Sequence, residues 1–303
     1  MTIQHIVDKP SRAALFLVLG VTPGGEDAVR DLIGGFKGLV KSLNFRYSAE
    51  DLFAVIGIGA KLWPRLTSAP VPAGLKEFEE ISQGKHTAPS TPGDLLFHFR
   101  AESYDVCHEL ASQILTKLGD AVRVLDETQG FKYLDGRDLL GFVDGSANPT
   151  DNEALETVLL PEDADYPRGS YVTVQKYTHD LKAWAQLTVE EQEDVIGRSK
   201  VDDIEMDDDV KPSNSHVALN DLDEDIYREN MAFGSFASGE MGTYFIGYAR
   251  DPEFINERLR NMFIGDPVGN YDRILDFSTA VTGTNFFVPS LTLMGEFSEL
   301  PLP

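Results

Sequence analysis

The order of apolar segments constrains the fold of this 303-residue chain more than any other feature of its sequence. Short apolar or alternating runs predict strands, and apolar residues spaced by three and four predict helices. In the first half these segments are strand 13–19, helix 26–42, strand 52–58, strand 94–101, helix 104–118 and strand 121–125. This order of strands and helices is typical of a ferredoxin-like unit.

The second half contains a similar succession of strands and helices. Its segments are strand 170–177, a helix from Thr188 to Gly197, strand 243–249, a helix from Asp251 to about Met262, and strand 283–288. Glu191 follows Thr188 by three residues, a capping box that satisfies free amides at a helix start. We therefore predict an α+β fold of two ferredoxin-like units, with antiparallel sheets and peripheral helices. Prolines and acids between 148 and 168 predict the join, so the units are 1–150 and 151–303.

Charge and cysteine content limit the partners and the compartment. The formal net charge is -24, which opposes binding to nucleic acid and to anionic lipid. No apolar run approaches the ~20 residues that a membrane-spanning helix needs. Cys107 is the only cysteine and recurs with apolar residues at helical spacing, so we expect a core thiol and no intrachain disulfide. The N-terminus lacks a secretory signal, and we expect a cytoplasmic protein.

Several common enzyme and metal signatures are missing from the sequence. Gly57 and Gly59 have Leu62 where a dinucleotide-binding loop needs its third glycine, and the six histidines form no His-Glu-x-x-His. The acidic run from Asp221 fails as a calcium loop, because Ile226 replaces the required glycine at its sixth position. Such acidic runs are typical of solvated loops.

One acidic turn stands out. Asp144 lies in the string Gly141-Phe-Val-Asp-Gly145-Ser-Ala-Asn-Pro149, where flanking glycines permit close approach of a flat or bulky group to the backbone. Taken alone, Asp-Gly is also a standard turn dipeptide.

This string resembles the Gly-x-x-Asp-Gly motif of the dye-decolourising haem peroxidases, and the resemblance extends from Arg12 to Leu293. The segment 212–217 resembles the family's proximal-histidine region, which implies that His216 is the axial ligand of one haem b per chain. The segment 226–234 resembles the distal-arginine stretch, which implies that Arg228 and Asn230 lie over the haem. Without the family, such a histidine or arginine is typical of an exposed surface residue.

The resemblance assigns further positions. Arg198 is expected to meet a haem propionate, Gly145 to approach the haem face and Phe245 to close the pocket. A carboxylate that accepts a hydrogen bond from the proximal histidine makes its imidazole more electron-rich, and Asp276 is the candidate for this role. The alternative for Asp276 is a surface contact.

The resemblance also implies a function. It predicts an enzyme that reduces hydrogen peroxide and oxidises small aromatic or dye-like donors through a ferryl intermediate. Asp144 and Arg228, assisted by Asn230, are the predicted catalytic residues, with Asp144 in the N-terminal unit and the haem pocket in the C-terminal one. The alternative is a non-enzymatic haem or iron carrier. A homo-oligomer is expected. Packaging in a protein shell is left open, because the terminal segment 298–303 gives no confident signal for it.

Overall fold

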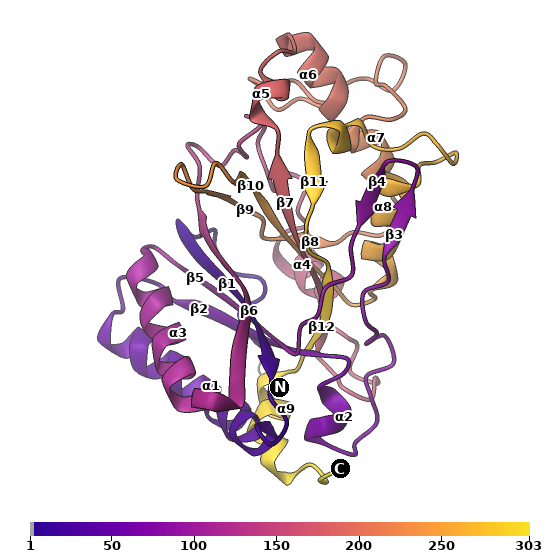
Figure 1. The fold of residues 1–303 in the computed structure, drawn as a ribbon. Coiled ribbons are helices and arrows are strands. Elements are labelled where there is room, and N and C mark those ends of the chain that lie inside the picture. The colour runs from indigo at the N-terminus through magenta and orange to yellow at the C-terminus, as the bar shows by residue number, and fades with distance from the viewer. Residues whose placement is uncertain (1–2) are drawn as a thin grey trace.

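The computed structural model describes residues 3–303 (Figure 1). The strands are β1 Ala13–Val21, β2 Phe53–Gly59, β3 Ile81–Gln83, β4 His86–Ala88, β5 Leu95–Ala101, β6 Val122–Phe131, β7 Ser170–His179, β8 Tyr227–Arg228, β9 Met231–Gly234, β10 Met241–Ala249, β11 Ser278–Ala280 and β12 Thr284–Val288. The helices are α1 Glu26–Arg46, α2 Trp63–Leu66, α3 Tyr104–Leu118, α4 Asp151–Val158, α5 Leu181–Trp184, α6 Val189–Ile196, α7 His216–Asn220, α8 Glu253–Phe263 and α9 Leu291–Gly295.

Antiparallel pairing closes eight of these strands into a ring. Its order is β1, β5, β2, β12, β7, β10, β9, β6 and back to β1. One seam between the two halves joins β2 to β12, where Phe286 pairs with Gly59. The other joins β6 to β9, where Phe131 pairs with Ala232. The two predicted ferredoxin-like units are therefore present and share one continuous hydrogen-bonded sheet. Each half contributes four strands to the ring, and β9, the fourth strand of the second half, was not predicted.

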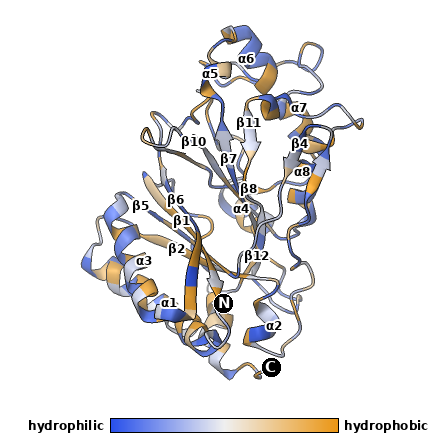
Figure 2. Ribbon diagram, viewed as in Figure 1, coloured by the Kyte–Doolittle hydropathy of each residue, from blue (hydrophilic) through white to orange (hydrophobic). Residues whose placement is uncertain are grey.

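Apolar side chains from both halves fill the interior of the ring. Phe16, Tyr244 and Phe286 are buried there, and the rings of Phe16 and Tyr244 stack with centroids 4.1 Å apart. Outside the first half, α1 and α3 cover the sheet and bury a larger cluster, which includes Phe36 and Cys107. These helices alternate hydrophobic and hydrophilic positions along their length (Figure 2), as expected for helices that pack one face on a sheet.

Most predicted elements are present, and one prediction is wrong. The helix beginning after Thr188 has its capping box, and Gly197 ends it in the left-handed conformation with φ 91°. The stretch 148–168, predicted as a loop, contains α4. Ala154 and Val158 are buried on one side of this helix. A short amphipathic helix therefore forms between the prolines, because its eight residues suffice to bury one apolar face. No helix within residues 3–303 is long and apolar enough to cross a membrane.

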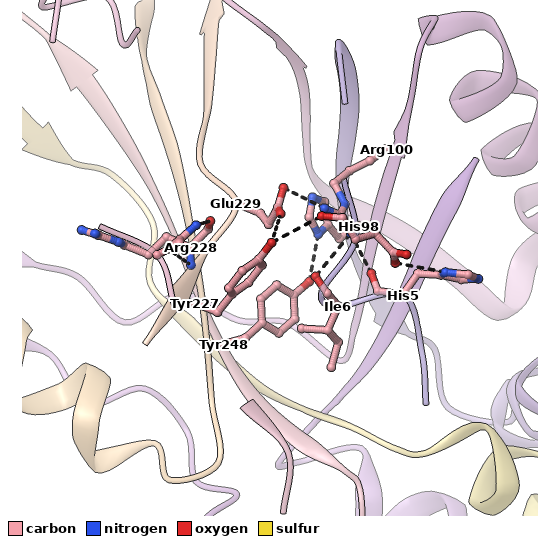
Figure 3. A network of polar contacts seen from close by, with 10 residues as sticks. His5, Ile6, His98, Arg100, Tyr227, Arg228, Glu229 and Tyr248 are labelled. Atoms are coloured by element: carbon pink, nitrogen blue, oxygen red, sulfur yellow. Dashed lines mark hydrogen bonds and ion pairs between the residues drawn. The ribbon is translucent and has the colours of Figure 1, made fainter. Parts of the chain in front are cut away.

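A buried polar network lies where the two halves meet (Figure 3). Arg100 on β5 forms an ion pair with Glu229 at 2.7 Å, and the Arg100 side chain is only 1% exposed. Tyr227 donates a hydrogen bond to Glu229 (2.9 Å), and Arg100 also donates to the carbonyl of His5 (2.8 Å). Glu229 is thereby held between strands of both units.

Removing one partner of this buried pair is expected to destabilise the protein strongly. Arg100→Leu leaves the Glu229 carboxylate buried without its cation, which typically costs about 3–5 kcal/mol in the free energy of unfolding. Urea unfolding measures the change. Arg250→Leu is the matched control, because Arg250 pairs with Glu224 at the same 2.7 Å but both side chains are exposed, and exposed pairs contribute about 0–1 kcal/mol. Equal losses in the two variants would contradict the expectation.

Candidate active site

A cavity lies on the outer face of the second half, between the sheet strands β7 and β10 and the helices α7 and α8. The loop that carries Asp144 closes one side. The predicted site residues that line this cavity are Asp144, Gly145, Arg198, His216, Arg228, Asn230 and Phe245. The structure therefore brings together every predicted site residue except Asp276, although these residues come from positions about a hundred residues apart.

His216 begins α7, and its ring orientation is set by its neighbours. Ser215 caps the helix by accepting a hydrogen bond from the amide of Ala218. Nδ1 of His216 lies 2.7 Å from Oδ2 of Asp272, a fully buried carboxylate. Burial lowers the pKa of His216, but the charge of Asp272 and its hydrogen bond offset this and leave the pKa above its ordinary value. Because Nδ1 is engaged, Nε2 is the ring atom available to a ligand.

A second histidine in the cavity is not available as a ligand. His179 on β7 has Nε2 within 2.9 Å of the Thr243 hydroxyl and Nδ1 within 2.8 Å of the Ser278 hydroxyl. Burial lowers the pKa of His179 to about 4, so this ring is neutral over the ordinary pH range. Among the described residues that line the cavity, one imidazole nitrogen is therefore free, Nε2 of His216.

Asp276 is not the partner of His216, and this prediction is corrected. Asp276 forms an ion pair with Lys85 at 2.5 Å and accepts a hydrogen bond from Tyr271 at 3.0 Å. Burial raises the pKa of Asp276, but these two contacts lower it below its ordinary value overall. The reason is local: Asp272 caps the 3₁₀ turn Arg273–Asp276 and lies at its buried end, whereas Asp276 ends the turn facing the β3–β4 hairpin.

The Asp144 loop is built around two left-handed glycines. Gly141 has φ 95° and Gly145 has φ 83°, conformations that a side chain disfavours. The amide of Asp144 donates to the carbonyl of Gly136 (3.0 Å), and the amide of Asn148 donates to the carbonyl of Gly145 (3.2 Å). Asp144 is therefore held between two closed turns with its side chain at the cavity.

Asp138 is a cavity residue that sequence reasoning missed. Its carboxylate accepts a hydrogen bond from the amide of Phe142 (3.0 Å). Burial and the nearby Asp144 raise the pKa of Asp138 to about 6, despite backbone hydrogen bonds that lower it. The sequence offers no signal for this, because Asp138 looks like one more acid in a turn.

Arg228 is the last residue of β8, and Asn230 lies in the short break between β8 and β9. Asn230 donates from Nδ2 to Oδ1 of Asp144 (3.3 Å) and accepts at Oδ1 from the amide of Ile246 (3.1 Å). Nε of Arg228 is buried without a hydrogen-bond partner among the described residues. Arg228 and Glu229 point in opposite directions (Figure 3), as adjacent residues of an extended strand do. A charged donor in the cavity is thus left to bind something else.

Two other predicted residues occupy the cavity wall. Arg198 pairs with Asp203 at 2.9 Å and with Glu205 at 3.3 Å, so its guanidinium is already oriented by its own loop. Phe245 on β10 lies among apolar residues that include Ile255 and Leu259 of α8. The wall is therefore largely apolar, with its charges concentrated at a few points.

The side chains at the cavity are suited to a metal ion that is already held by a cofactor. Residues 3–303 contain no group of three or more His, Cys, Asp or Glu side chains that could hold a metal ion. The cavity instead offers one free imidazole nitrogen, an unpaired guanidinium nitrogen and apolar walls. A porphyrin iron needs one protein ligand and an apolar surround, so these residues fit a haem.

Comparisons with known proteins identify the same family that the sequence motifs resemble. The family description "Dyp-type peroxidase, N-terminal" matches residues 4–132, and "Dyp-type peroxidase, C-terminal" matches residues 135–293. A dye-decolorizing peroxidase of Brevibacterium linens is 55% identical over 95% of this chain and 81% of its own. One of Rhodococcus erythropolis is 51% identical over 98% of this chain and 89% of its own.

Solved structures of members of this family are similar to this chain over nearly its whole length. DyPB from Rhodococcus jostii RHA1 superposes with a TM-score of 0.94 at 51% identity, covering 96% of this chain and 97% of the other. A variant of that protein is described as in complex with heme. The encapsulated DyP-type peroxidase of Mycobacterium smegmatis has a TM-score of 0.96 at 51% identity, covering 100% and 99%. The two curated relatives and the Mycobacterium smegmatis protein are described as peroxidases, so the alternative of haem handling without catalysis has no support. The chain belongs to the Dyp-type peroxidase family.

Proposed function

We propose that this enzyme binds one haem b through Nε2 of His216 and uses Asp144, Arg228 and Asn230 to reduce hydrogen peroxide, with small aromatic or dye-like molecules as electron donors. The observation that carries the proposal is the convergence, on one cavity, of a free imidazole nitrogen with an unpaired guanidinium and a carboxylate. The haem-containing relative supports the choice of cofactor.

A bound haem would supply a redox-active iron centre, which could give two electrons to peroxide and recover them from the donors. The chain's own residues manage the proton and the charge. The Asp144 carboxylate takes the proton from one peroxide oxygen and returns it to the other. The Arg228 guanidinium stabilises the negative charge that develops on the departing oxygen. Asn230 holds Oδ1 of Asp144 by its hydrogen bond.

Asp272 fixes the tautomer of His216 through Nδ1 and increases the electron density of the ring, which would strengthen a bond from Nε2 to a haem iron. Asp272→Asn keeps the size of the side chain and its helix-capping oxygen but removes the charge. We expect haem to dissociate about 10–100-fold faster from this variant, measured as transfer to an excess of a haem-free globin. Asp276→Asn is the matched control and is expected to match the parent protein; the opposite ranking would contradict the assignment of Asp272.

The remaining predicted residues are assigned to haem binding. Arg198 binds a propionate, because guanidinium groups form paired hydrogen bonds with carboxylates. Gly145 lets the backbone approach the porphyrin face, since it carries no side chain there. Phe245 contributes to the apolar wall that keeps water from the reacting oxygen atoms.

The experiment that tests the proposal is an absorption titration of the purified protein with haemin, followed by addition of peroxide and an aromatic donor. We expect one haem to bind per chain, a spectral change on adding peroxide, and recovery of the starting spectrum when an excess of the donor has reduced the haem again. A haem-loaded protein whose spectrum is unchanged at millimolar peroxide would overturn the proposal.

We also propose that residues 1–150 and 151–303 are the two units of the duplication, and that the enzyme is a cytoplasmic homo-oligomer. The relative described as encapsulated supports a location inside the cell. Light scattering of the purified protein and cell fractionation test the oligomer and the location.

A further inference from the structure

Asn148 joins the two segments that carry the catalytic residues. Its side-chain Nδ2 donates to the carbonyl of Arg228 (2.7 Å), and its Oδ1 accepts from the amide of Arg228 (3.0 Å). One side-chain amide thus makes both hydrogen bonds that a neighbouring strand residue would make with the Arg228 backbone. These bonds cross from the Asp144 loop to a residue 80 positions further along the chain.

The path from Asn148 back to Asp144 is short and stiff. The amide of Asn148 closes a turn on the carbonyl of Gly145 (3.2 Å), and Asp144 immediately precedes that turn. Pro149 follows Asn148 and restricts its backbone to extended conformations. Few freely rotating bonds therefore separate the Asp144 carboxylate from the Arg228 backbone, so a shift of one segment moves the other.

We propose that Asn148 is a positioning residue for the peroxide reaction, setting the separation between the Asp144 carboxylate and the Arg228 guanidinium. It touches neither haem nor peroxide in this role. The inference rests on the proposed function, because it assigns Asn148 a purpose only if Asp144 and Arg228 act on the same peroxide.

A purely structural bridge is the competing explanation, and the chain contains a matched control for it. Asn44, at the end of α1, makes the same pair of bonds with Leu52: Nδ2 donates to the carbonyl (2.7 Å) and Oδ1 accepts from the amide (3.0 Å). Asn44 is in the first half and does not line the cavity. Asn148→Ala and Asn44→Ala therefore remove equivalent hydrogen bonds at different places.

The first measurement needs no haem. Hydrogen exchange followed by mass spectrometry reports on the amide of Arg228 in the haem-free protein. Asn148→Ala is expected to speed exchange in the peptide containing Arg228 and Asn44→Ala to leave it unchanged, because only the first removes the acceptor of that amide. Unchanged exchange in Asn148→Ala would show that the bridge does not hold this segment, which overturns the proposal.

The second measurement is the stopped-flow rate of the peroxide reaction in haem-loaded protein. A displacement of about 1 Å at a reacting group costs about a hundredfold, so Asn148→Ala is expected to lose ten- to a hundredfold and Asn44→Ala less than twofold. Asn148→Ser provides a second variant should alanine fold poorly, since its hydroxyl is too short to span both bonds. Equal rates in the Asn148 and Asn44 variants would overturn the proposal.

A double-mutant cycle separates positioning from general loosening. In an Arg228→Leu background, Asn148→Ala is expected to have no further effect on the rate, because the group it positions is gone. Independent, multiplying effects would overturn the inference. The cycle also distinguishes the two levels of failure: if Arg228→Leu alone leaves the rate intact, the proposed function itself fails, whereas a slow Arg228→Leu with a normal Asn148→Ala sinks the positioning role alone.

Discussion

His216→Ala is expected to raise the dissociation constant for haem by more than about a hundredfold, because even the partners that orient a metal-binding histidine are worth about 10–100-fold. The variant removes the one imidazole nitrogen that is free among the cavity residues within 3–303. Titration of the haem-free protein with haemin, followed at the porphyrin absorption band, measures the change.

The control for this prediction is His179→Ala. His179 lines the same cavity and has a similar size, but both of its ring nitrogens are hydrogen-bonded to hydroxyl groups. It is expected to bind haem with nearly the affinity of the parent protein. Equal losses in the two variants would mean that the cavity holds haem by shape alone and that His216 is not its ligand.

The second large effect is expected at the proposed catalytic residues, Arg228 and Asp144. Arg228→Leu removes the charge that stabilises the departing oxygen and should slow the peroxide reaction about 10²–10³-fold. Asp144→Asn removes the proton acceptor and should slow the same step about 10²–10⁴-fold. Both variants should keep their haem, because neither touches His216. Stopped-flow absorption at increasing peroxide concentration measures the rate constant.

Arg228→Lys provides a graded comparison, since it retains a positive charge without the planar fork of the guanidinium. Its rate is expected to lie between those of the parent and Arg228→Leu. If Arg228→Leu and Asp144→Asn both react with peroxide at the parent rate, the catalytic assignment is wrong, whatever the haem affinity.

The sequence allowed most of the architecture to be predicted, because its elements carry strong local signals. The capping box at Thr188 and the apolar spacing of 104–118 both mark the helices found in the structure. The helix α4 was missed, since its eight residues contain too few apolar positions to show a period against the surrounding prolines.

The site was predictable only in part, and for a physical reason. His216, Asp144 and Arg228 were assigned through motifs, and they do line one cavity. Asp276 was predicted as the partner of His216, but the partner is Asp272, because the buried end of the 3₁₀ turn is the one that faces His216. Which end of a turn is buried is a property of packing that residue spacing does not encode. The bridging role of Asn148 was invisible for the same reason, because its partner lies 80 residues away.

Closure of the strand ring has a consequence for biosynthesis. The last strand, β12, occupies Thr284–Val288, and it alone covers the edge of β2. A ribosome must therefore synthesise the chain as far as β12 before the strand ring can be completed. Until then the nascent first unit presents an unpaired strand edge, which is a template for misassembly with other chains. Truncations that remove β12 should consequently aggregate during expression instead of accumulating as a folded first unit.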